Sequence, residues 1–95
     1  MACPVVRRGP EVLAFRHPLA GLQLVKGGIE PGETPAGAAL RELAEEAGVT
    51  GREARPMGDF RAGGLHWHLL SVRTGPLSDR WIHRCTDDGG HDFEF

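Results

Sequence analysis

The side chains of this sequence best suited to chemistry are four glutamates, Glu33, Glu42, Glu45 and Glu46. On a helix the last three stand at i, i+3 and i+4, so they share one narrow stripe. Like charges at that spacing repel and raise one another's pKa unless a cation compensates. Carboxylate oxygens suit Mg²⁺ or Mn²⁺, whereas Zn²⁺ favours histidine or cysteine, which residues 27–49 lack. The pattern predicts a Mg²⁺ site, with Mn²⁺ as the alternative.

The element that must position these glutamates is a helix of about 13 residues, bracketed by start and stop signals. Thr34 suits an N-cap, Pro35 is tolerated in a first turn, and Gly48 suits a left-handed C-cap. A neighbouring stripe is apolar and is predicted to pack against a sheet. Its members are Ala36, Leu40, Leu43 and Ala47.

Residues 27–49, GGIEPGETPAGAALRELAEEAGV, resemble the Nudix box. Gly27 is followed after five residues by Glu33 and after seven more by Arg41-Glu42-Leu43-Ala44-Glu45-Glu46, then by Gly48 and an apolar residue. Every fixed position of that family's pattern is filled. A glutamate run such as LAEEAG alone is more often a solvated helix face. The upstream glycines and Glu33 favour the Nudix interpretation, and the family hydrolyses nucleoside diphosphates linked to another group.

The resemblance implies an α/β (α+β) fold, in which a mixed sheet lies between the box helix and a second helix as an α/β/α sandwich. Residues 1–95 are expected to form a single domain, because the chain has no room for a second core. Phe93 and Phe95 alternate with acidic residues in HDFEF, which is typical of a strand just beginning. We therefore expect the family's later strand and C-terminal helix to be missing, through truncation or because a partner supplies the cover.

By the same resemblance, the metal would be held by the Gly27 carbonyl and by Glu42, Glu45 and Glu46. The catalytic residues would be Glu42, Arg41 and Glu46. Glu42 is the first candidate for orienting or deprotonating the attacking water, and Arg41 is expected to orient the glutamates through charge-assisted hydrogen bonds. Some family members take the base from a later loop or strand. The carboxylates available there are Asp87, Asp88, Asp92 and Glu94.

Three weaker signals lie outside this cluster. Lys26 adjoins the loop that contains Gly27, Gly28 and Gly32, here called the glycine loop. It could reach a substrate phosphate, although a surface lysine is the commoner role. Trp67 could stack on a base, although most such tryptophans are core. His66 and His68 share one strand face, but a pair without a third ligand is a poor metal site. We expect Glu33, just before the helix, to have a structural role near the positive end of the helix dipole.

The net charge of −2 is distributed unevenly. Residues 30–46 hold five glutamates against one arginine, a local charge of −4. Without a basic stripe, the chain is a poor candidate for binding long nucleic acid. Small phosphorylated metabolites or nucleotides are suitable partners, because a bound metal would invert the local potential.

The first residues lack a signal peptide or membrane span, and Cys3 and Cys85 form no metal-binding spacing, so we expect a cytoplasmic protein.

Strands are expected on both sides of the helix, broken at Gly9-Pro10, Gly63-Gly64 and Gly75-Pro76. The first two expected strands would form a hairpin. The expected strand ranges are 3–8, 12–17, 22–25, 55–61, 65–72 and 81–86.

Three functions remain open. The first is a Mg²⁺-dependent pyrophosphohydrolase that cleaves a phosphoanhydride bond in a nucleoside diphosphate derivative. The second is a non-catalytic Nudix module that senses nucleotides or mediates interactions. The third is an inactive fragment, whose exposed sheet edge and apolar face would promote self-association, including a homodimer.

Overall fold

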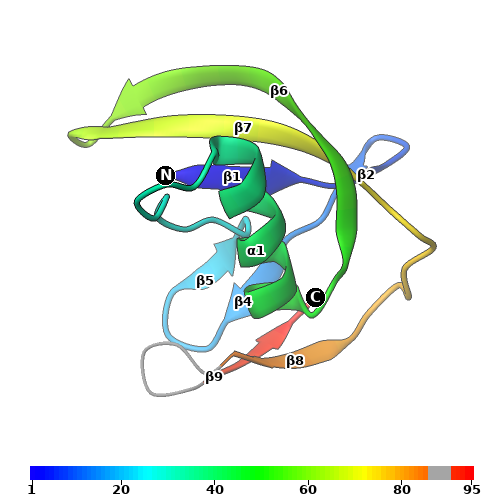
Figure 1. Cartoon of the computed structure of the whole chain (residues 1–95). Helices are drawn as coiled ribbons and strands as arrows, with labels where there is room; N and C mark the ends of the chain where they lie inside the picture. The colour runs from blue at the N-terminus through cyan, green and yellow to red at the C-terminus, as the bar shows by residue number, and fades with distance from the viewer. Residues whose placement is uncertain (86–90) are drawn as a thin grey trace.

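The computed structural model describes residues 1–85 and 91–95 (Figure 1). Its elements are one helix and nine strands within those ranges. They run in chain order as β1 (Ala2–Val5), β2 (Arg7–Arg8), β3 (Glu11–Val12), β4 (Phe15–His17), β5 (Gly21–Gln23), α1 (Pro35–Ala47), β6 (Gly51–Ala62), β7 (Leu65–Thr74), β8 (Ile82–Cys85) and β9 (His91–Glu94).

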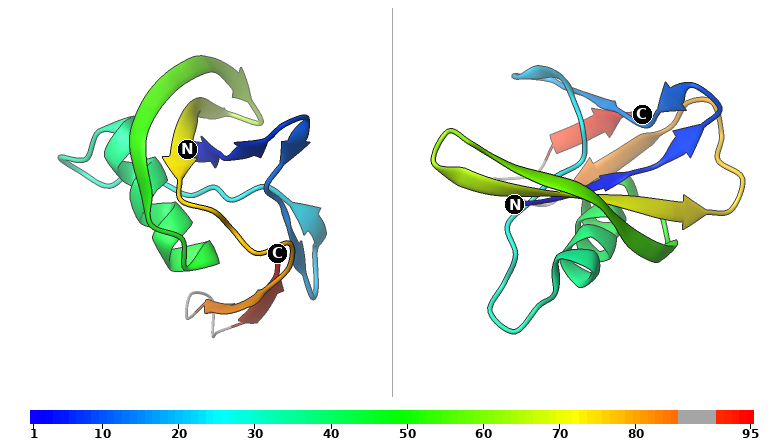
Figure 2. Two further views of the ribbon diagram at one scale, coloured as in Figure 1. Left: turned by 90° about the vertical axis from the view of Figure 1, so that its right-hand side faces the viewer. Right: turned by 90° about the horizontal axis from the view of Figure 1, so that it is seen from above.

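The strands form a three-stranded mixed sheet and a four-stranded antiparallel sheet, with a small β2-β3 ribbon. In the first sheet, β7 pairs in parallel with β1 and antiparallel with β6. The second sheet has the order β5-β4-β9-β8. Helix α1 contacts strands of both sheets, and Figure 2 shows it beside the three-stranded sheet from two directions. The predicted α+β class with a mixed sheet is confirmed.

Helix α1 begins and ends where the sequence predicts. The Thr34 hydroxyl accepts a hydrogen bond from the Gly37 amide at 3.0 Å, and Pro35 occupies the first turn. At the other end Gly48 adopts a φ of 69°, a left-handed conformation that residues with a Cβ rarely adopt. Its amide donates to the Ala44 carbonyl at 3.0 Å. These caps fix the 13 residues that carry the glutamates.

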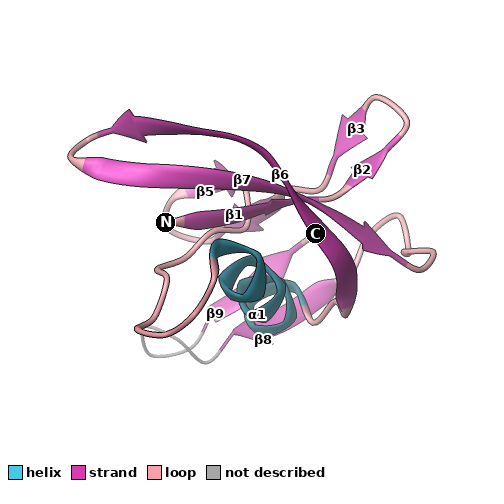
Figure 3. Cartoon of the chain, turned by 45° about the horizontal axis from the view of Figure 1, so that its top comes forward, coloured by secondary structure: helices cyan, strands magenta, loops and turns pink. Residues whose placement is uncertain are grey.

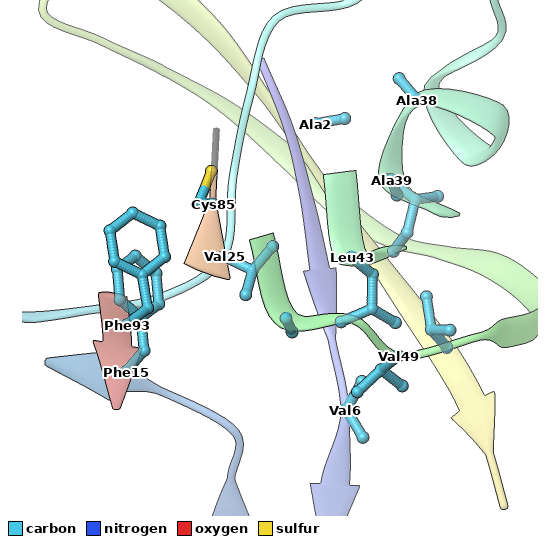
Figure 4. Close-up of a cluster of buried hydrophobic side chains, with 13 residues drawn as sticks. Ala2, Val6, Phe15, Val25, Ala38, Ala39, Leu43, Val49, Cys85 and Phe93 are labelled. Atoms are coloured by element: carbon cyan, nitrogen blue, oxygen red, sulfur yellow. The ribbon is translucent and has the colours of Figure 1, made fainter. Parts of the chain in front are cut away.

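The core lies between the helix and the two sheets (Figures 3 and 4). Leu43 and Leu70 join the helix to β7, and Val25 fills the space beside them. Phe15 and Phe93 stack at 4.5 Å between ring centroids on the inner face of the four-stranded sheet. The apolar stripe predicted on the helix is confirmed, because Leu43 and Ala47 are buried while Ala36 and Leu40 pack against the core.

The hairpin expected from residues 3–8 and 12–17 is confirmed only next to its turn. Only Arg7–Arg8 and Glu11–Val12 pair with each other, around Gly9, which has a φ of 61°. Ala2–Val5 instead pairs with β7, which buries three of its four residues, and Phe15–His17 joins the second sheet. Burying the apolar β1 beside a central strand removes more surface from water than a local hairpin would.

The other strand predictions differ mainly at their ends. The third strand is Gly21–Gln23 rather than 22–25, and β6 extends from Gly51 to Ala62 through two register shifts. The first four residues of HDFEF, His91–Glu94, form β9, which pairs with both β8 and β4. Residues 86–90, including the Thr86 end of the sixth expected strand, lie outside the described residues.

Trp81, which directly precedes β8, and His83 on β8 both contact the last turn of the helix. The Trp81 indole N–H donates to the Ala47 carbonyl at 3.0 Å, and the Trp81 ring stacks on Phe95 at 5.2 Å. His83 Nε2 lies 3.1 Å from the Glu45 carbonyl oxygen. Of the helices that the structure describes, none is long and apolar enough to cross a membrane.

Candidate functional site

Arg41 lies at the centre of a group of carboxylates, here called the glutamate cluster, which consists of Glu33, Glu42, Glu45 and Glu46. Its Nε and Nη2 donate to both carboxylate oxygens of Glu33, at 2.8 and 3.0 Å. Nη2 also donates to the Gly28 carbonyl at 2.8 Å. Nη1 donates to Glu42 at 2.8 Å and to Glu45 at 3.3 Å. One guanidinium thus joins the glycine loop to two turns of the helix, and the planar fork of arginine suits this arrangement.

The contact with Arg41 determines the charge state of Glu33. The hydrogen bonds from Arg41, followed by one from the Glu30 backbone amide, lower the pKa of Glu33 to about 2. The same carboxylate raises the pKa of Arg41, so the pair stays charged throughout the physiological range. Glu33 therefore anchors Arg41, which agrees with the structural role expected for it.

Gly27 lies directly against Glu42. A Cβ at this position would overlap the Glu42 carboxylate, so no residue larger than glycine fits without moving it. The Gly27 backbone is held from the other side by Ala2, with which it exchanges two hydrogen bonds of 2.8 and 3.0 Å. The Glu42 side chain is buried, with 7 % residue exposure. The loop backbone and this carboxylate are therefore in close contact.

Glu46 completes the cluster from the next turn of the helix. Burial raises its pKa to about 8, and the neighbouring charge of Glu42 acts in the same direction. A hydrogen bond between the two carboxyl groups adds to this effect, whereas the positive charge and the backbone amide of Lys26 oppose it. Near neutral pH, Glu46 therefore holds its proton in the metal-free protein.

Within residues 1–85 and 91–95, no three His, Cys, Asp or Glu side chains converge closely enough to hold a metal ion. The Arg41 Nη1 bridges Glu42 and Glu45 at this point. The donor chemistry nevertheless fits a hard divalent cation, because carboxylates crowd together here beside a glycine backbone. A cation bound here would displace the proton that Glu46 holds.

The three predicted metal-binding glutamates differ in environment. Glu42 is buried, Glu46 is half-buried and the Glu45 side chain is 44 % exposed. Since α1 packs its Glu42 side against the glycine loop, the stripe runs from core to solvent. Glu45 is thus the most exposed of the three carboxylates.

The structure brings Lys26 to the cluster and leaves Trp67 in a separate environment. Lys26 Nζ donates to Gln23 at 3.2 Å, and its charge acts on Glu46. Trp67 lies on β7, stacked on Phe60 with centroids 6.1 Å apart, and its indole N–H donates to the Ala62 carbonyl at 3.3 Å. None of these Trp67 contacts involves a residue of the glutamate cluster.

The two histidines beside Trp67 form a small polar group of their own. His66 Nε2 lies 2.6 Å from Asp59 Oδ2, and the His66 and His68 rings are 4.2 Å apart. The hydrogen bond from His66 lowers the pKa of Asp59. Asp59 was not expected from the sequence, because the β6-β7 pairing that aligns it with His68 is not readable from spacing.

Of the later carboxylates proposed as a base, the described ones have other partners. Asp92 pairs with Arg84 at 3.4 Å, and Glu94 lies beside Arg16 in the register of β9 and β4. Asp87 and Asp88 lie outside the described residues.

Three further contributors to the site could not be predicted from the sequence. These are the Gly28 carbonyl, the Glu30 amide and Ala2, which act through their backbones and so leave no side-chain signal.

A cavity of about 740 Å³ lies away from the glutamates. It is bordered by the β2-β3 ribbon, the end of β7, Leu77, Trp81 and Phe95, and it contains no residue of the cluster. A smaller cavity of about 220 Å³ lies between the start of α1 and the β6-β7 hairpin, beside Asp59 and His68. The concentrated carboxylate charge and the raised pKa of Glu46 make the glutamate cluster, rather than either cavity, the candidate site.

This chain matches a known protein family and several known proteins. The NUDIX domain family matches residues 1–94. Over 34 residues, or 36 % of this chain, the sequence is 59 % identical to diphosphoinositol polyphosphate phosphohydrolase 3-beta of Bos taurus and to the 3-alpha protein of Homo sapiens. The same identity over the same length relates it to diphosphoinositol polyphosphate phosphohydrolase 2 of Mus musculus. The aligned stretch spans 19 to 21 % of these relatives, about a fifth of their length.

Proposed function

This chain belongs to the Nudix hydrolase family, and from that premise we propose that it hydrolyses a phosphoanhydride bond in a small phosphorylated substrate, with Mg²⁺ as cofactor. The observation that carries the proposal is the cluster in which Arg41 binds Glu33, Glu42 and Glu45 while Gly27 lies against Glu42. Such a group of fixed carboxylates suits a divalent cation and a diphosphate together.

Each residue of the cluster would have a defined task. Glu42, Glu45 and Glu46 would hold the cation, with the Gly27 carbonyl as a further oxygen donor. When bound, a divalent cation polarises phosphoryl oxygens and lowers the pKa of a coordinated water. Arg41 positions Glu42 and Glu45 through its Nη1 and is itself fixed by Glu33. Lys26 would add positive charge for the substrate phosphates at the edge of the cluster.

Proton transfer would belong to Glu42 and Glu46. Because burial and the neighbouring charge of Glu42 keep a proton on Glu46, this carboxyl group could exchange a proton with water when the charge balance changes. Glu42 is the residue that we propose orients or deprotonates the water. Its buried carboxylate, fixed by Arg41 at 2.8 Å, keeps a constant direction for that step.

Two substrate classes follow from different observations. The Nudix box indicates a nucleoside diphosphate derivative, cleaved to a nucleotide and a phosphorylated remainder. The names of the relatives add diphosphoinositol polyphosphates, which also carry a diphosphate group. We place the activity in the cytosol, since no disulfide joins Cys3 to Cys85 in the structure, as expected in a reducing compartment.

The experiment is a phosphate-release assay with Mg²⁺ on a panel containing both substrate classes, using wild type, Glu46→Gln and Glu11→Gln. Glu46→Gln should lose at least about a hundredfold in kcat, because it removes a proton-exchanging group. Glu11, on the exposed β3, is the matched control and should keep wild-type turnover.

The same panel separates the rival functions. A nucleotide-sensing module would bind a panel compound without releasing product, and Glu46→Gln would keep most of that affinity. An inactive fragment would neither bind nor cleave. Absence of product from every compound with the wild-type chain would refute the hydrolase proposal.

A further inference from the structure

The outer face of the four-stranded sheet carries a row of side chains that crosses all four strands. The strand register aligns Leu22 on β5 with Arg16 on β4, Arg16 with Glu94 on β9, and Glu94 with Ile82 on β8. Neighbouring residues in register point to the same face of a sheet. Leu22 and Ile82 are 72 % and 66 % exposed, and Arg16 and Glu94 are exposed as well.

The opposite face of the same strands is core. Phe15 and Phe93, each next in sequence to a member of the row, are 2 % and 6 % exposed and stack on each other. The row is therefore on the side away from the core, and all four of its side chains are exposed. Leu24, 41 % exposed and two residues beyond Leu22, extends the apolar end of the row.

The order of the row is self-complementary. From edge to edge it reads apolar, positive, negative, apolar, and a twofold axis parallel to the strands would place a second copy on it in reverse order. Leu22 would then face Ile82 of the second copy, and Arg16 would face Glu94 of the second copy. The four charges would form a square of alternating sign. Both copies would use the same surface patch, as in an isologous dimer.

Other arrangements of two copies are less favourable. A twofold axis in the same plane but perpendicular to the strands would place Arg16 on Arg16 and Glu94 on Glu94, and like charges across an interface are repelled. The favoured axis keeps the strands of the two sheets nearly aligned, as face-to-face sheets normally pack. The face is built from strands of three or four residues, smaller than a standard interface, so association should be weak.

From this order of charges and apolar side chains, we propose that the outer face of the β5-β4-β9-β8 sheet binds a second copy of this chain, forming a twofold dimer centred on Arg16 and Glu94. The dimer is independent of the glutamate cluster. It accounts for four exposed side chains that the proposed hydrolysis does not use.

Sedimentation equilibrium on the full chain, from about 10 µM to 1 mM, tests the proposal, with a dissociation constant expected on the order of 100 µM for so small a face. Arg16→Glu and Glu94→Arg each place like charges opposite one another twice per dimer. Each should raise the dissociation constant at least about tenfold. The double variant Arg16→Glu/Glu94→Arg restores opposite signs and should return the constant to within about threefold of wild type.

Two further variants keep the test independent of folding defects. Leu22→Asp lies at the exposed edge of the row and should also dissociate the dimer. Met57→Asp, on the other sheet and 48 % exposed, should leave it unchanged. A wild-type chain that stays monomeric at 1 mM, a double variant as monomeric as the single ones, or dissociation by Met57→Asp alone would each overturn the proposal.

Discussion

At the scale of single residues, Gly27 decides how closely the glycine loop can approach the helix. Its backbone is fixed on one side by Ala2 and its Cα faces the Glu42 carboxylate on the other. The neighbouring Gly28 has open space where a Cβ would be, although its carbonyl binds Arg41. Gly27 thus matters because it has no side chain to collide with Glu42, whereas Gly28 matters because its carbonyl accepts a hydrogen bond from Arg41.

Gly27→Ala should therefore damage the site more than the fold. The added methyl group would push the Glu42 carboxylate away from Arg41, and a displacement of that size costs on the order of a hundredfold in turnover. The matched control is Gly28→Ala, where a methyl group meets nothing within 4 Å. Steady-state kinetics on the two variants decide the matter. Equal losses in both would show that the loop needs glycine for flexibility instead.

Glu46 gives the metal-free protein a stability that depends on pH. Because its folded pKa of about 8 lies above the ordinary glutamate value of 4.5, the fold favours the neutral carboxyl group. The contribution of Glu46 to stability is complete below pH 4.5, falls as pH rises from 4.5 to 8, and stays low above pH 8. Glu46→Gln, which remains neutral, should gain thermal stability relative to wild type over that interval.

Thermal melts with a chelator from pH 4 to pH 9 measure this difference. The two proteins should be closest near pH 4, where both side chains are neutral, and farthest apart above pH 8. Comparing the variant with wild type at each pH cancels the opposite contribution of Glu33, whose pKa of about 2 favours the fold at higher pH. A difference in melting temperature that does not change with pH would contradict the assignment.

At the scale of elements, the helix is held by its caps more than by charge, since no acidic residue lies in its first turn and no basic one in its last. Thr34→Ala removes the hydroxyl that accepts from the Gly37 amide and should cost about 1 kcal/mol of unfolding free energy. Urea denaturation measures it, and Thr34→Ser, which keeps the hydroxyl, should stay within a few tenths of wild type. Equal losses in the two variants would mean that the Thr34 methyl group is what matters.

The helix was predictable from sequence because its signals are local. Thr34, Pro35 and Gly48 act within one or two turns, so their spacing is sufficient to predict both ends. Strand pairing is not local. Ala2–Val5 joins β7, more than sixty residues away, and nothing in the sequence favours that pairing over the nearby 12–17 segment.

The site divides in the same way. The glutamates and Arg41 were predicted, because their side chains form a spaced pattern on one helix. The contacts that fix them were not, because Gly28 and Ala2 act through backbone atoms and His83 reaches the helix from a distant strand. The burial of Glu42 was equally hidden, since an i, i+3, i+4 pattern does not say which member faces the core.

At the scale of the whole molecule, the glutamate cluster joins three parts of the chain: β1 through Ala2, the glycine loop, and the helix. A ligand that binds the folded cluster and not the unfolded chain should therefore stabilise the entire domain. At ten times its dissociation constant, Mg²⁺ should add about 1.4 kcal/mol. That corresponds to a rise in melting temperature of several degrees for a domain of this size.

Calorimetry with MgCl₂, compared with NaCl at equal ionic strength, measures the rise. The double variant Glu42→Gln/Glu46→Gln should lose it, and Glu11→Gln should keep it. A rise of the same size in the double variant would place the cation elsewhere on the molecule.

The contact between Trp81 and the end of the helix also provides an optical probe. Its indole N–H is bonded to the Ala47 carbonyl and its ring is stacked on Phe95, so its fluorescence depends on the helix remaining docked on the second sheet. The other tryptophan, Trp67, stacks on Phe60 in the β6-β7 hairpin and would contribute a separate signal. Trp67→Phe would leave Trp81 as the sole emitter, and docking of the helix could then be followed in real time without any attached dye.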